Sequence, residues 1–529
     1  MSKKQAVVAQ ADELADGQMK QVSVEGTDVL LTRVDGQYHA VGAYCTHYGA
    51  PLATGVLSGT RVVCPWHHAC FSVVSGDQEE PPGLDALPCF EVKVENGQVI
   101  VAVPEEATKQ RVPGMAKPDP ADQRVFAILG GGAAGAAAAE VLRQEGFKGR
   151  VVLIGAESFL PYDRTTMSKG YLAEREKQSG VRPSRSEAFY AEHGIEVLVG
   201  KRVAKVRVEA RQIEFADEGT LHYDALLLAT GATPRQLPVP GAELDGVMTL
   251  RTPLDADRIA AAAQAGTKAV VIGSSFIGME CAAALRSRNV QVQVVAMEQV
   301  PFERVLGKEV GGLFKTIAEE SGVVFHFNAQ VDHLAGKGKV EKVVLKGGVE
   351  LEADLVVVGA GVKPVTDYLE GVAKNPDGSV SVDEFMKVVG ADRLYAAGDI
   401  AAFPDPLSGE RIRIEHWRVA GQQGRVAARN MAGHATPFTQ VPFFWTRQFN
   451  QNLRYVGHAS SWDELVVDGD LGQKNFLAYY VKSGQVRAVA GAGRDKALCA
   501  IEECLRLRKM PALAALRAGG FDWEAQLQA

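Results

Sequence analysis

Hydrophobic and polar positions follow two different patterns along the chain, and the first one covers residues 1–105. Short runs of β-branched residues there are interrupted by the turn pairs Glu25-Gly26 and Asp35-Gly36, which is typical of consecutive strands. Two more such runs flank Asn96-Gly97, a pair that tolerates the tight turn of a hairpin. This part of the chain is predicted to be all-β.

The second pattern begins at about residue 123. Apolar strands followed by Gly-rich turns and Ala-rich helices recur up to about residue 361, which indicates parallel sheets covered by helices. Two strand–Gly–helix units lie 143 residues apart, at Gly130 and Gly273, and they predict two α/β domains of related design. From about residue 437 the chain is again rich in strands, and it ends in helices.

These changes of pattern divide the chain into several parts, as expected for 529 residues at about 150 residues per domain. The segment before the α/β region is charged and contains prolines, which is typical of a linker. The predicted parts are an all-β domain at 1–105, a linker at 106–122, a first α/β domain in two pieces at 123–250 and 371–437, a second α/β domain at 251–370, and a C-terminal α+β domain at 438–529.

Composition narrows the class of protein. The chain is 46% hydrophobic, and its net charge of -7 results from 57 basic and 64 acidic residues, so neither nucleic acid nor an anionic membrane is an expected partner. The N-terminus carries no secretion signal pattern, and the longest uncharged run, at 125–139, is too short to span a bilayer. We therefore expect a cytoplasmic protein.

Cysteine and histidine residues cluster within 45–71. Cys45 and His47 form a C-x-H pair, and Cys64 and His67 form a C-x2-H pair. Zinc, the alternative, is usually bound by two Cys pairs or by a His pair on a helix. Two mixed pairs in loops between strands resemble instead the Rieske [2Fe–2S] centre, in which two thiolates bind one iron and two imidazoles bind the other.

Other residues of the same segment are not needed as ligands. Cys70, Cys89 and His68 are expected to be structural or solvent-facing. In Rieske proteins of respiratory membrane complexes, a disulfide clamps the cluster, and Ser and Tyr hydroxyls donate to it. In this chain Ala50 and Trp66 occupy the positions of the disulfide cysteines, and Ala69 and Phe71 occupy the positions of the two hydroxyl donors. Without these donors we expect a potential near the low end of the Rieske range, about −150 mV, as in the ferredoxins of soluble oxygenase systems.

The first Gly-rich turn matches the pattern G-x-G-x-x-G through Gly130, Gly132 and Gly135, directly after an apolar strand. The glycines permit a tight turn, the approach of a pyrophosphate and close packing of helix and strand. Glu157 ends the next strand, 22 residues after Gly135, where an acidic side chain reaches a ribose hydroxyl. The motif predicts a dinucleotide site.

The second turn contains Gly273, Ser275 and Gly278, with a serine at the middle position. At the end of the following strand Ala296 occupies the usual place of the ribose-binding acid, and Glu298 comes two residues later. We see no arginine at that strand end to bind a 2′-phosphate. The sequence therefore favours NADH over NADPH.

Five further blocks carry a family resemblance. They are "PYDRTTMSKGYL" at 161–172, "ALLLATGATPRQLPVPG" at 225–241, "LYAAGDIA" at 394–401, "EHWRVAGQQGRVAARNM" at 415–431 and "VPFFWTRQF" at 441–449. In this order they resemble the flavoprotein NAD(P)H-dependent ferredoxin reductases, and in particular their apoptosis-inducing-factor-like branch. The resemblance covers about residues 123–529.

The resemblance implies roles for named residues. FAD would be held by Gly130, Gly132, Gly135, Glu157, Arg164, Lys169 and Asp399, and the nicotinamide nucleotide site would be lined by Gly273, Ser275, Gly278 and Glu280. Lys169 and Glu280 would meet beside the reactive edge of the flavin, where a buried cation stabilises the reduced anion. Trp417 and Trp445 would lie near the flavin or nicotinamide pocket, with a place in the core as the alternative.

One related class of flavoenzymes is excluded. Disulfide reductases pass electrons to a cysteine pair near the FAD, but residues 158–172 contain no cysteine and the second motif is followed only by Cys281. Cys499 and Cys504 lie in the helical tail, and we expect them to be ordinary buried or surface thiols rather than a redox-active pair. Electrons must leave the flavin by another route.

The sequence therefore predicts a Rieske domain fused to a flavoprotein reductase. NADH would reduce FAD, and the cluster would carry single electrons to an acceptor such as an oxygenase, a cytochrome or a ferredoxin. The alternative is a redox-controlled interaction protein like some relatives of apoptosis-inducing factor, with slow NADH oxidase activity. The oligomeric state stays open, a homodimer included.

Overall fold

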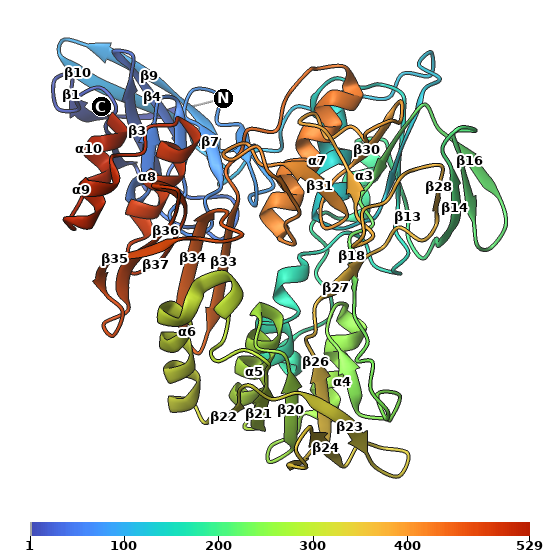
Figure 1. Ribbon diagram of the computed structural model, residues 1–529. Coiled ribbons are helices and arrows are strands. Elements are labelled where there is room, and N and C mark those ends of the chain that lie inside the picture. The colour runs from blue at the N-terminus through green and yellow to red at the C-terminus, as the bar shows by residue number, and fades with distance from the viewer. Residues whose placement is uncertain (1–2, 529) are drawn as a thin grey trace.

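The computed structural model describes residues 3–528 and shows an all-β domain, two α/β domains and a domain of strands and helices, as predicted (Figure 1). The N-terminal domain has two antiparallel sheets. Across the larger sheet the strands are β1 (Lys3–Gln10), β10 (Gln98–Pro104), β9 (Cys89–Glu95), β4 (Gln37–Gly42), β3 (Thr27–Val34) and β2 (Met19–Val24). The smaller sheet contains β5 (Val56–Ser58), β6 (Arg61–Val63), β7 (Cys70–Ser72) and β8 (Gln78–Glu80). The predicted hairpin is confirmed, since Asn96 and Gly97 turn between β9 and β10 with positive φ angles.

The first α/β domain is built on a parallel sheet. Its strands are, in order, β13 (Ile195–Leu198), β12 (Arg150–Ile154), β11 (Val125–Leu129), β17 (Ala225–Leu228) and β30 (Leu394–Ala396). Its helices are α1 (Ala133–Gln144), α2 (Gly170–Ala173), α3 (Glu187–Glu192) and α7 (Trp417–Ala432). Smaller sheets contain β14 (Val203–Arg207), β15 (Gln212–Phe215), β16 (Thr220–His222), β28 (Leu369–Glu370), β29 (Val380–Ser381), β31 (Ala401–Pro404) and β32 (Arg411–Ile412).

The second α/β domain repeats this design. Its parallel strands are β19 (Val247–Thr249), β26 (Leu355–Val358), β20 (Lys268–Ile272), β21 (Gln291–Val295) and β22 (Val323–His326). The helices are α4 (Pro253–Ala262), α5 (Phe276–Ser287) and α6 (Glu303–Glu320), and a small sheet contains β23 (Val331–Ala335), β24 (Lys342–Leu345) and β25 (Glu350–Glu352). In both domains the Gly-rich turn joins the central strand to a helix.

The chain passes between the two α/β domains through one strand pair, β18 (Ala232–Pro234) and β27 (Val362–Pro364). Because β19 pairs with β26, the second domain already includes residues before 251, and because β28 pairs with β14, residues 369 and 370 belong to the first domain. Both exchanges therefore come earlier in the chain than the predicted limits of 251 and 370.

The C-terminal domain has one antiparallel sheet and three helices. The strands are β33 (Phe443–Gln448), β34 (Gln451–Gly457), β37 (Gln485–Ala492), β36 (Asn475–Lys482) and β35 (Glu464–Asp470), and the helices are α8 (Asp495–Arg506), α9 (Leu513–Arg517) and α10 (Trp523–Gln528). This domain lies beside the N-terminal domain (Figure 1). The two share a hydrophobic core, in which Val56 and Val63 pack with Leu498 and Leu527.

The segment predicted as a linker is held along its length by backbone hydrogen bonds. Arg111 exchanges two with Ala86 of the N-terminal domain, both 2.8 Å long. Further on, Ala116 N–H donates to the Arg143 carbonyl at 2.8 Å and Asp119 N–H donates to the Lys148 carbonyl at 2.9 Å. The segment therefore lies first on the N-terminal domain and then on the first α/β domain.

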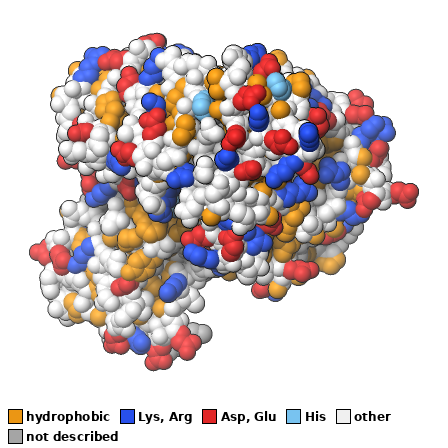
Figure 2. Space-filling view, turned by 90° about the horizontal axis from the view of Figure 1, so that it is seen from below, with side chains coloured by type: hydrophobic (Ala, Val, Ile, Leu, Met, Phe, Trp, Pro, Cys, Tyr) orange, Lys and Arg blue, Asp and Glu red, His pale blue; other side chains and the backbone are white. Residues whose placement is uncertain are grey.

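The surface carries charges of both signs. In Figure 2 acidic and basic side chains alternate over the visible face without a large area of one sign, as the small net charge predicts. Within residues 3–528, none of the helices combines the length and the apolar composition that a membrane crossing requires.

Candidate redox site

Two loops of the N-terminal domain bring the four predicted metal ligands together. Cys45 and His47 follow β4, and Cys64 and His67 follow β6. The thiols of Cys45 and Cys64 are within hydrogen-bonding contact, and the Nδ1 atoms of His47 and His67 are 3.2 Å apart. The site therefore consists of a pair of thiols and a pair of imidazoles.

The two loops have the same backbone design. In each, the cysteine N–H donates to the carbonyl oxygen five residues later, at 2.9 Å for both Cys45 and Cys64. The fourth residue after each cysteine has a positive φ, 74° at Gly49 and 55° at His68. This repeated turn points the side chains of both loops toward the same place.

The protonation of these side chains suits metal binding. Burial lowers the pKa of His47 to about 4 and that of His67 to about 2, so both imidazoles are neutral, the form that binds metal. The hydrogen bond with the Cys45 thiol and the backbone N–H groups of Trp66 and His67 lower the pKa of Cys64, which favours a thiolate there. The same hydrogen bond and burial raise the pKa of Cys45, so without metal the pair shares one proton between its two sulfurs.

The arrangement distinguishes between a single metal ion and a cluster. Structural zinc is usually bound by Cys pairs or by a His pair on a helix, whereas each of the two loops here provides one thiol and one imidazole. Two thiols beside two imidazoles match the division of ligands in a Rieske cluster. The residues present thus fit a [2Fe–2S] group, with Cys45 and Cys64 on one iron and His47 and His67 on the other.

The first Gly-rich turn leaves space above the N-terminus of α1. Gly130 has a φ of 114°, and a Cβ there would lie 2.1 Å from the Ala229 carbonyl oxygen. A Cβ on Gly135 would lie 1.9 Å from the Gly130 oxygen, whereas one on Gly132 would meet nothing within 4 Å. The open space lies where the free N–H groups at the start of the helix could donate hydrogen bonds to a pyrophosphate.

Acidic and basic side chains are paired around this turn. Glu157 accepts from Arg164 Nη2 at 2.6 Å and from the Tyr162 hydroxyl at 2.8 Å. Asp399 accepts from Arg251 Nη2 at 2.9 Å. Glu157 and Asp399 are thus fixed near the turn by arginines, which leaves further oxygen lone pairs for ribose or ribitol hydroxyls.

A cavity of about 590 Å³ lies in front of the two Gly-rich turns, and it has the size and the mixed lining of a cofactor site. Predicted residues from three domains line it: Gly132, Arg164, Lys169, Ser275, Glu280, Asp399, Trp417 and Trp445. Glu157 and Glu298 lie outside this lining, after the strands β12 and β21. The residues fit one FAD and one nicotinamide nucleotide that meet in the same cavity.

The second Gly-rich turn has the same geometry as the first. A Cβ on Gly273 would lie 2.4 Å from the Gly359 carbonyl oxygen, and one on Gly278 would lie 2.2 Å from the Gly273 oxygen. Ser275 is the N-cap residue of α5, but its side chain does not cap the helix. The serine hydroxyl therefore remains free toward the cavity.

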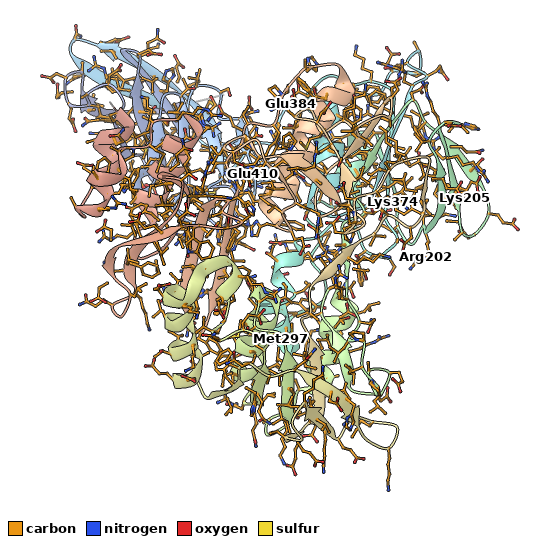
Figure 3. The ribbon with its side chains drawn as sticks, in the orientation of Figure 1. Arg202, Lys205, Met297, Lys374, Glu384 and Glu410 are labelled. Atoms are coloured by element: carbon orange, nitrogen blue, oxygen red, sulfur yellow. The ribbon has the colours of Figure 1, made fainter. Side chains whose placement is uncertain are left out.

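The sequence has no arginine at the end of β21, and the structure brings one to Glu298 from another element. Arg304 Nε pairs with Glu298 at 3.0 Å, and Arg304 lines the cavity. Glu298 follows Met297, which Figure 3 shows at the end of the second domain that faces the rest of the molecule. The arginine comes from the start of α6 rather than from the strand, so spacing along the strand did not reveal it.

Lys169 and Glu280 form an ion pair at the cavity, with the carboxylate buried and the lysine partly exposed. Lys169 Nζ lies 2.8 Å from Glu280 Oε2, and the Glu280 side chain is 4% exposed. The hydroxyls of Ser168 and Thr446 also donate to this carboxylate, at 2.5 and 2.7 Å. Both α/β domains and the C-terminal domain thus meet at one carboxylate.

Trp445 connects the cavity with the cluster ligands. Its ring centroid is 4.6 Å from that of His67 and 5.1 Å from that of His416. Trp445 lines the 590 Å³ cavity and also a second, more open cleft of about 1040 Å³. His67, Tyr48, Trp66, Lys169, Glu280 and Arg447 line that cleft as well. One indole thus lies between the predicted flavin cavity and a predicted metal ligand.

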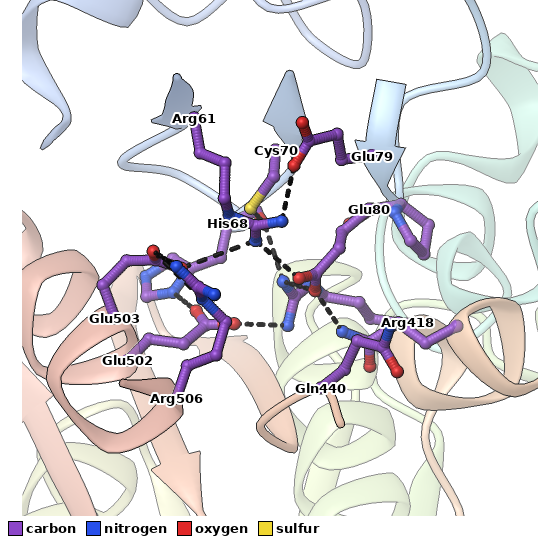
Figure 4. Close-up of polar contacts among 12 residues, drawn as sticks. Arg61, His68, Cys70, Glu79, Glu80, Arg418, Gln440, Glu502, Glu503 and Arg506 are labelled. Carbon is purple, nitrogen blue, oxygen red and sulfur yellow. Dashed lines mark hydrogen bonds and ion pairs between the residues drawn. The ribbon is translucent and has the colours of Figure 1, made fainter. Parts of the chain in front are cut away.

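A buried polar network joins the N-terminal domain to the rest of the chain (Figure 4). The side chain of Arg418 is 0% exposed and pairs with Glu80 and Glu502, both at 2.9 Å. His68 is also 0% exposed, and its Nδ1 forms a hydrogen bond with the Glu502 carboxylate. Sequence reasoning expected His68 to be structural or solvent-facing and assigned no role to Glu80, Arg418 or Glu502, because α8 carries several charged residues and nothing in its sequence marks Glu502 as buried.

The remaining cysteines are isolated thiols. All seven cysteines of the chain lie within the described residues and are free. Burial raises the pKa of Cys281 to about 12 and that of Cys504 to about 11, which makes both unreactive. Cys499 and Cys70 are buried, and Cys89 is exposed.

Comparisons with known proteins agree with this architecture. Residues 124–424 match the model of the pyridine nucleotide-disulphide oxidoreductases, residues 4–91 match the Rieske [2Fe-2S] domain, and residues 443–526 match the reductase C-terminal domain. Human apoptosis-inducing factor 3 is 40% identical over 512 residues, which cover 95% of this chain and 84% of the relative. Rhodocoxin reductase of Rhodococcus erythropolis is 33% identical over 76% of this chain and 93% of its own length.

A solved structure shares the flavoprotein part. The covalent complex of putidaredoxin reductase with putidaredoxin has a TM-score of 0.72 and 28% identity, and it covers 77% of this chain and 99% of the reductase. The chain belongs to the pyridine nucleotide-disulphide oxidoreductases, as an FAD- and NAD(P)H-dependent oxidoreductase of the ferredoxin-reductase type with a Rieske [2Fe-2S] domain before its flavoprotein part.

Proposed function

We propose that this chain transfers electrons from NADH to a one-electron acceptor protein by way of its own FAD and its own Rieske cluster. FAD, when bound, supplies the link between a two-electron donor and single-electron release, and the cluster supplies a one-electron carrier. The protein has to position both groups, exclude water and stabilise charge.

The contact between His67 and Trp445 carries this proposal. The two rings are 4.6 Å apart at their centroids, and Trp445 also lines the flavin cavity. A ligand of the cluster is therefore separated from the flavin cavity by a single indole. Since the linker and the buried network fix the N-terminal domain in this position, transfer within one chain requires no encounter between molecules.

Lys169 and Glu280 are proposed to stabilise charge at the flavin edge. Their ion pair is 2.8 Å long and lines the cavity. Lys169→Ala should slow flavin reduction by NADH and disfavour the reduced flavin by roughly 3 kcal/mol, since a buried charge loses its partner. Lys177→Ala, a change at an exposed lysine, is the matched control. An unaltered flavin potential in Lys169→Ala would remove this role.

Glu298 and Arg304 are proposed to bind the adenosine end of the nucleotide. The carboxylate suits ribose hydroxyls, whereas the arginine could bind a 2′-phosphate. Because Arg304 is paired with Glu298, we propose a preference for NADH. Glu298→Gln should lower the ratio of kcat/KM for NADH to that for NADPH, and an unchanged ratio would exclude Glu298 from the site.

The acceptor is proposed to be an oxygenase, a cytochrome or a ferredoxin, and it would approach the cluster at the cleft. Tyr48 and Trp66 line the cleft beside His67 and are 55% and 41% exposed. Exposed aromatic side chains beside a redox centre suit a transient protein partner. In the similar solved structure, putidaredoxin is the protein held in covalent complex with its reductase.

An anaerobic titration with NADH tests the whole proposal. The purified protein should contain one FAD, two irons and two labile sulfides, and visible absorption and electron paramagnetic resonance should show flavin and cluster reduced by NADH at rates independent of protein concentration. Stoichiometric zinc without labile sulfide would disprove the cluster. A long-lived reduced flavin–NAD complex with NADH-dependent oligomerisation would favour the interaction protein instead.

A further inference from the structure

The flavoprotein part donates hydrogen bonds to the second ligand loop of the cluster. Arg418 Nη2 donates to the His68 carbonyl oxygen at 2.8 Å, and Arg454 Nε donates to the Trp66 oxygen at 2.9 Å. The Cys499 thiol donates to the Cys64 oxygen at 3.6 Å. Alternate carbonyls of this loop thus accept from side chains that lie more than 300 residues away in the sequence.

The first ligand loop has no equivalent contacts. Among the described residues, no side chain of the flavoprotein part donates to a carbonyl between residues 45 and 50. Tyr48 instead donates its own hydroxyl to Asp163, at 3.4 Å. Within residues 3–528, hydrogen bonds from flavoprotein side chains to ligand-loop carbonyls are therefore confined to the loop of Cys64 and His67.

The two arginines differ in their surroundings. Arg418 lies between Glu80 and Glu502, and all three side chains are at most 5% exposed, so its charge is balanced locally. Arg454 is 7% exposed and has one carboxylate partner, Asp495, which is 38% exposed. Solvent screens an exposed carboxylate more than a buried guanidinium, so a net positive potential remains at the loop.

We propose that Arg454 is a positioning residue of the Rieske cluster that raises its reduction potential and orients its second loop. This proposal rests on the cluster assigned above. Reduction adds a negative charge, and a guanidinium, which stays protonated, favours that state in a poorly solvated site. Ala69 and Phe71 provide no hydroxyl donors. Arg454 therefore replaces part of the stabilisation that Ser and Tyr hydroxyls give the cluster in other Rieske proteins.

Arg454 and Asp495 make predictions of opposite sign. Arg454→Met should shift the one-electron equilibrium about tenfold toward the oxidised cluster, which is 59 mV for one electron, and should alter the resonance spectrum of the reduced cluster. Asp495→Asn removes the nearby negative charge and should raise the potential. Arg454→Lys keeps the charge and should stay within about twofold of the parent.

Arg425→Met is the matched control. Arg425 is buried at the same interface and lies on α7, but its hydrogen bonds go to Gln78 and not to the ligand loop. Its substitution should leave the cluster potential unchanged. If Arg454→Met fails to retain the cluster, Asp495→Asn and Arg454→Lys carry the test.

The potentials are measured on the full chain by titration with dithionite and mediators, followed by electron paramagnetic resonance. This reduction requires neither NADH nor electron transfer through FAD. A failure of NADH to reduce the cluster would therefore refute the proposed electron path, but it would not affect the inference about Arg454 and the cluster potential. An unchanged potential in Arg454→Met, or shifts of the same sign in Arg454→Met and Asp495→Asn, would overturn it.

Discussion

The two ligand loops have the same backbone and opposite surroundings. Each closes with the same 2.9 Å hydrogen bond from its cysteine and has a left-handed residue at the fourth position after it. In the first loop this residue is Gly49, around whose Cα a side chain would meet nothing within 4 Å. In the second it is His68, which is fully buried and bonded to Glu502.

The comparison separates two requirements of the site. The first requirement is to place a thiol and an imidazole, and this depends on the turn, which both Gly49 and His68 permit. The left-handed conformation costs a non-glycine residue about 1 kcal/mol. His68 accepts that cost and provides a contact that glycine cannot. The second loop therefore positions two predicted metal ligands and also anchors the domain to the flavoprotein part, while Tyr48 and Gly49 of the first loop remain exposed.

Removing a ligand from either loop should have the largest effect and the same effect. Cys45→Ser and Cys64→Ser should both abolish the cluster, because each thiolate binds the same iron. Flavin reduction by NADH should remain nearly intact, and delivery to a one-electron acceptor protein should fall to the background of the flavoprotein. Iron and sulfide analysis with stopped-flow kinetics checks this, with Cys89→Ser, a change at an exposed cysteine, as control.

A cluster-free variant that reduces the acceptor as fast as the parent would contradict this expectation. The cluster would then not be the outlet for electrons, and the flavin would have to react with the acceptor directly. Loss of the cluster in only one of the two variants would show that the loops are not equivalent as ligands.

The anchor on the second loop should make stability depend on pH. Burial raises the pKa of Glu502 from 4.5 to about 7, so the folded chain binds more protons than the unfolded chain between these values. Stability contributed by the protonated group is thus lost as pH rises through about 7, by about 3 kcal/mol at 1.36 kcal/mol per pH unit. Glu502→Gln does not ionise, so its Tm should fall less over this window in thermal unfolding.

Glu502 faces charged groups from several elements, chiefly Arg418 of α7, Glu80 of β8 and Arg61 of β6. Asp470→Asn, a change at an exposed carboxylate on β35, should reproduce the parent's pH dependence. Equal pH dependence in Glu502→Gln and in the parent would show that another group titrates.

His68→Ala and Gly49→Ala compare the fourth positions directly. His68→Ala should lower the free energy of unfolding by about 1–3 kcal/mol, because Glu502 loses its hydrogen-bond partner in a buried site. Gly49→Ala should cost about 1 kcal/mol, through the strained φ alone. Denaturant unfolding measures both, and a larger loss in Gly49→Ala would reverse the assignment of the anchor to the second loop.

The smallest effect is expected from the exposed side of the first loop. Tyr48→Phe removes a 3.4 Å hydrogen bond to Asp163 on the surface, and such bonds contribute less than about 1 kcal/mol. Stability and cluster content should be unchanged within error. A marked loss of either would mean that the first loop is also an anchor.

The sequence predicted the chemistry of the site better than its surroundings. Cys45, His47, Cys64 and His67 were identified because metal binding demands particular residue types at short spacing. The outer glycines of both nucleotide turns were identified because only a residue without a side chain fits there, as Gly130 and Gly135 show. Such requirements are local, and a local pattern reveals them.

The contacts between domains were not predictable in this way. His68 was expected to be structural or solvent-facing, yet its partner Glu502 lies 434 residues away. Glutamates and arginines are usually solvated, so Arg418 and Glu502 gave no sign of burial. The composition of residues 106–122 indicated a linker but could not show that its backbone bonds to both neighbouring domains.

The contacts of α8 and α10 with the N-terminal domain have a consequence for biosynthesis. Gln528 of α10 donates to the Leu57 carbonyl oxygen at 3.2 Å, and α8 covers the second ligand loop through Cys499 and Glu502. Domains fold in the order in which the ribosome releases them. The N-terminal domain therefore emerges with its second ligand loop uncovered, and α8 covers that loop only once the C-terminal domain has been translated.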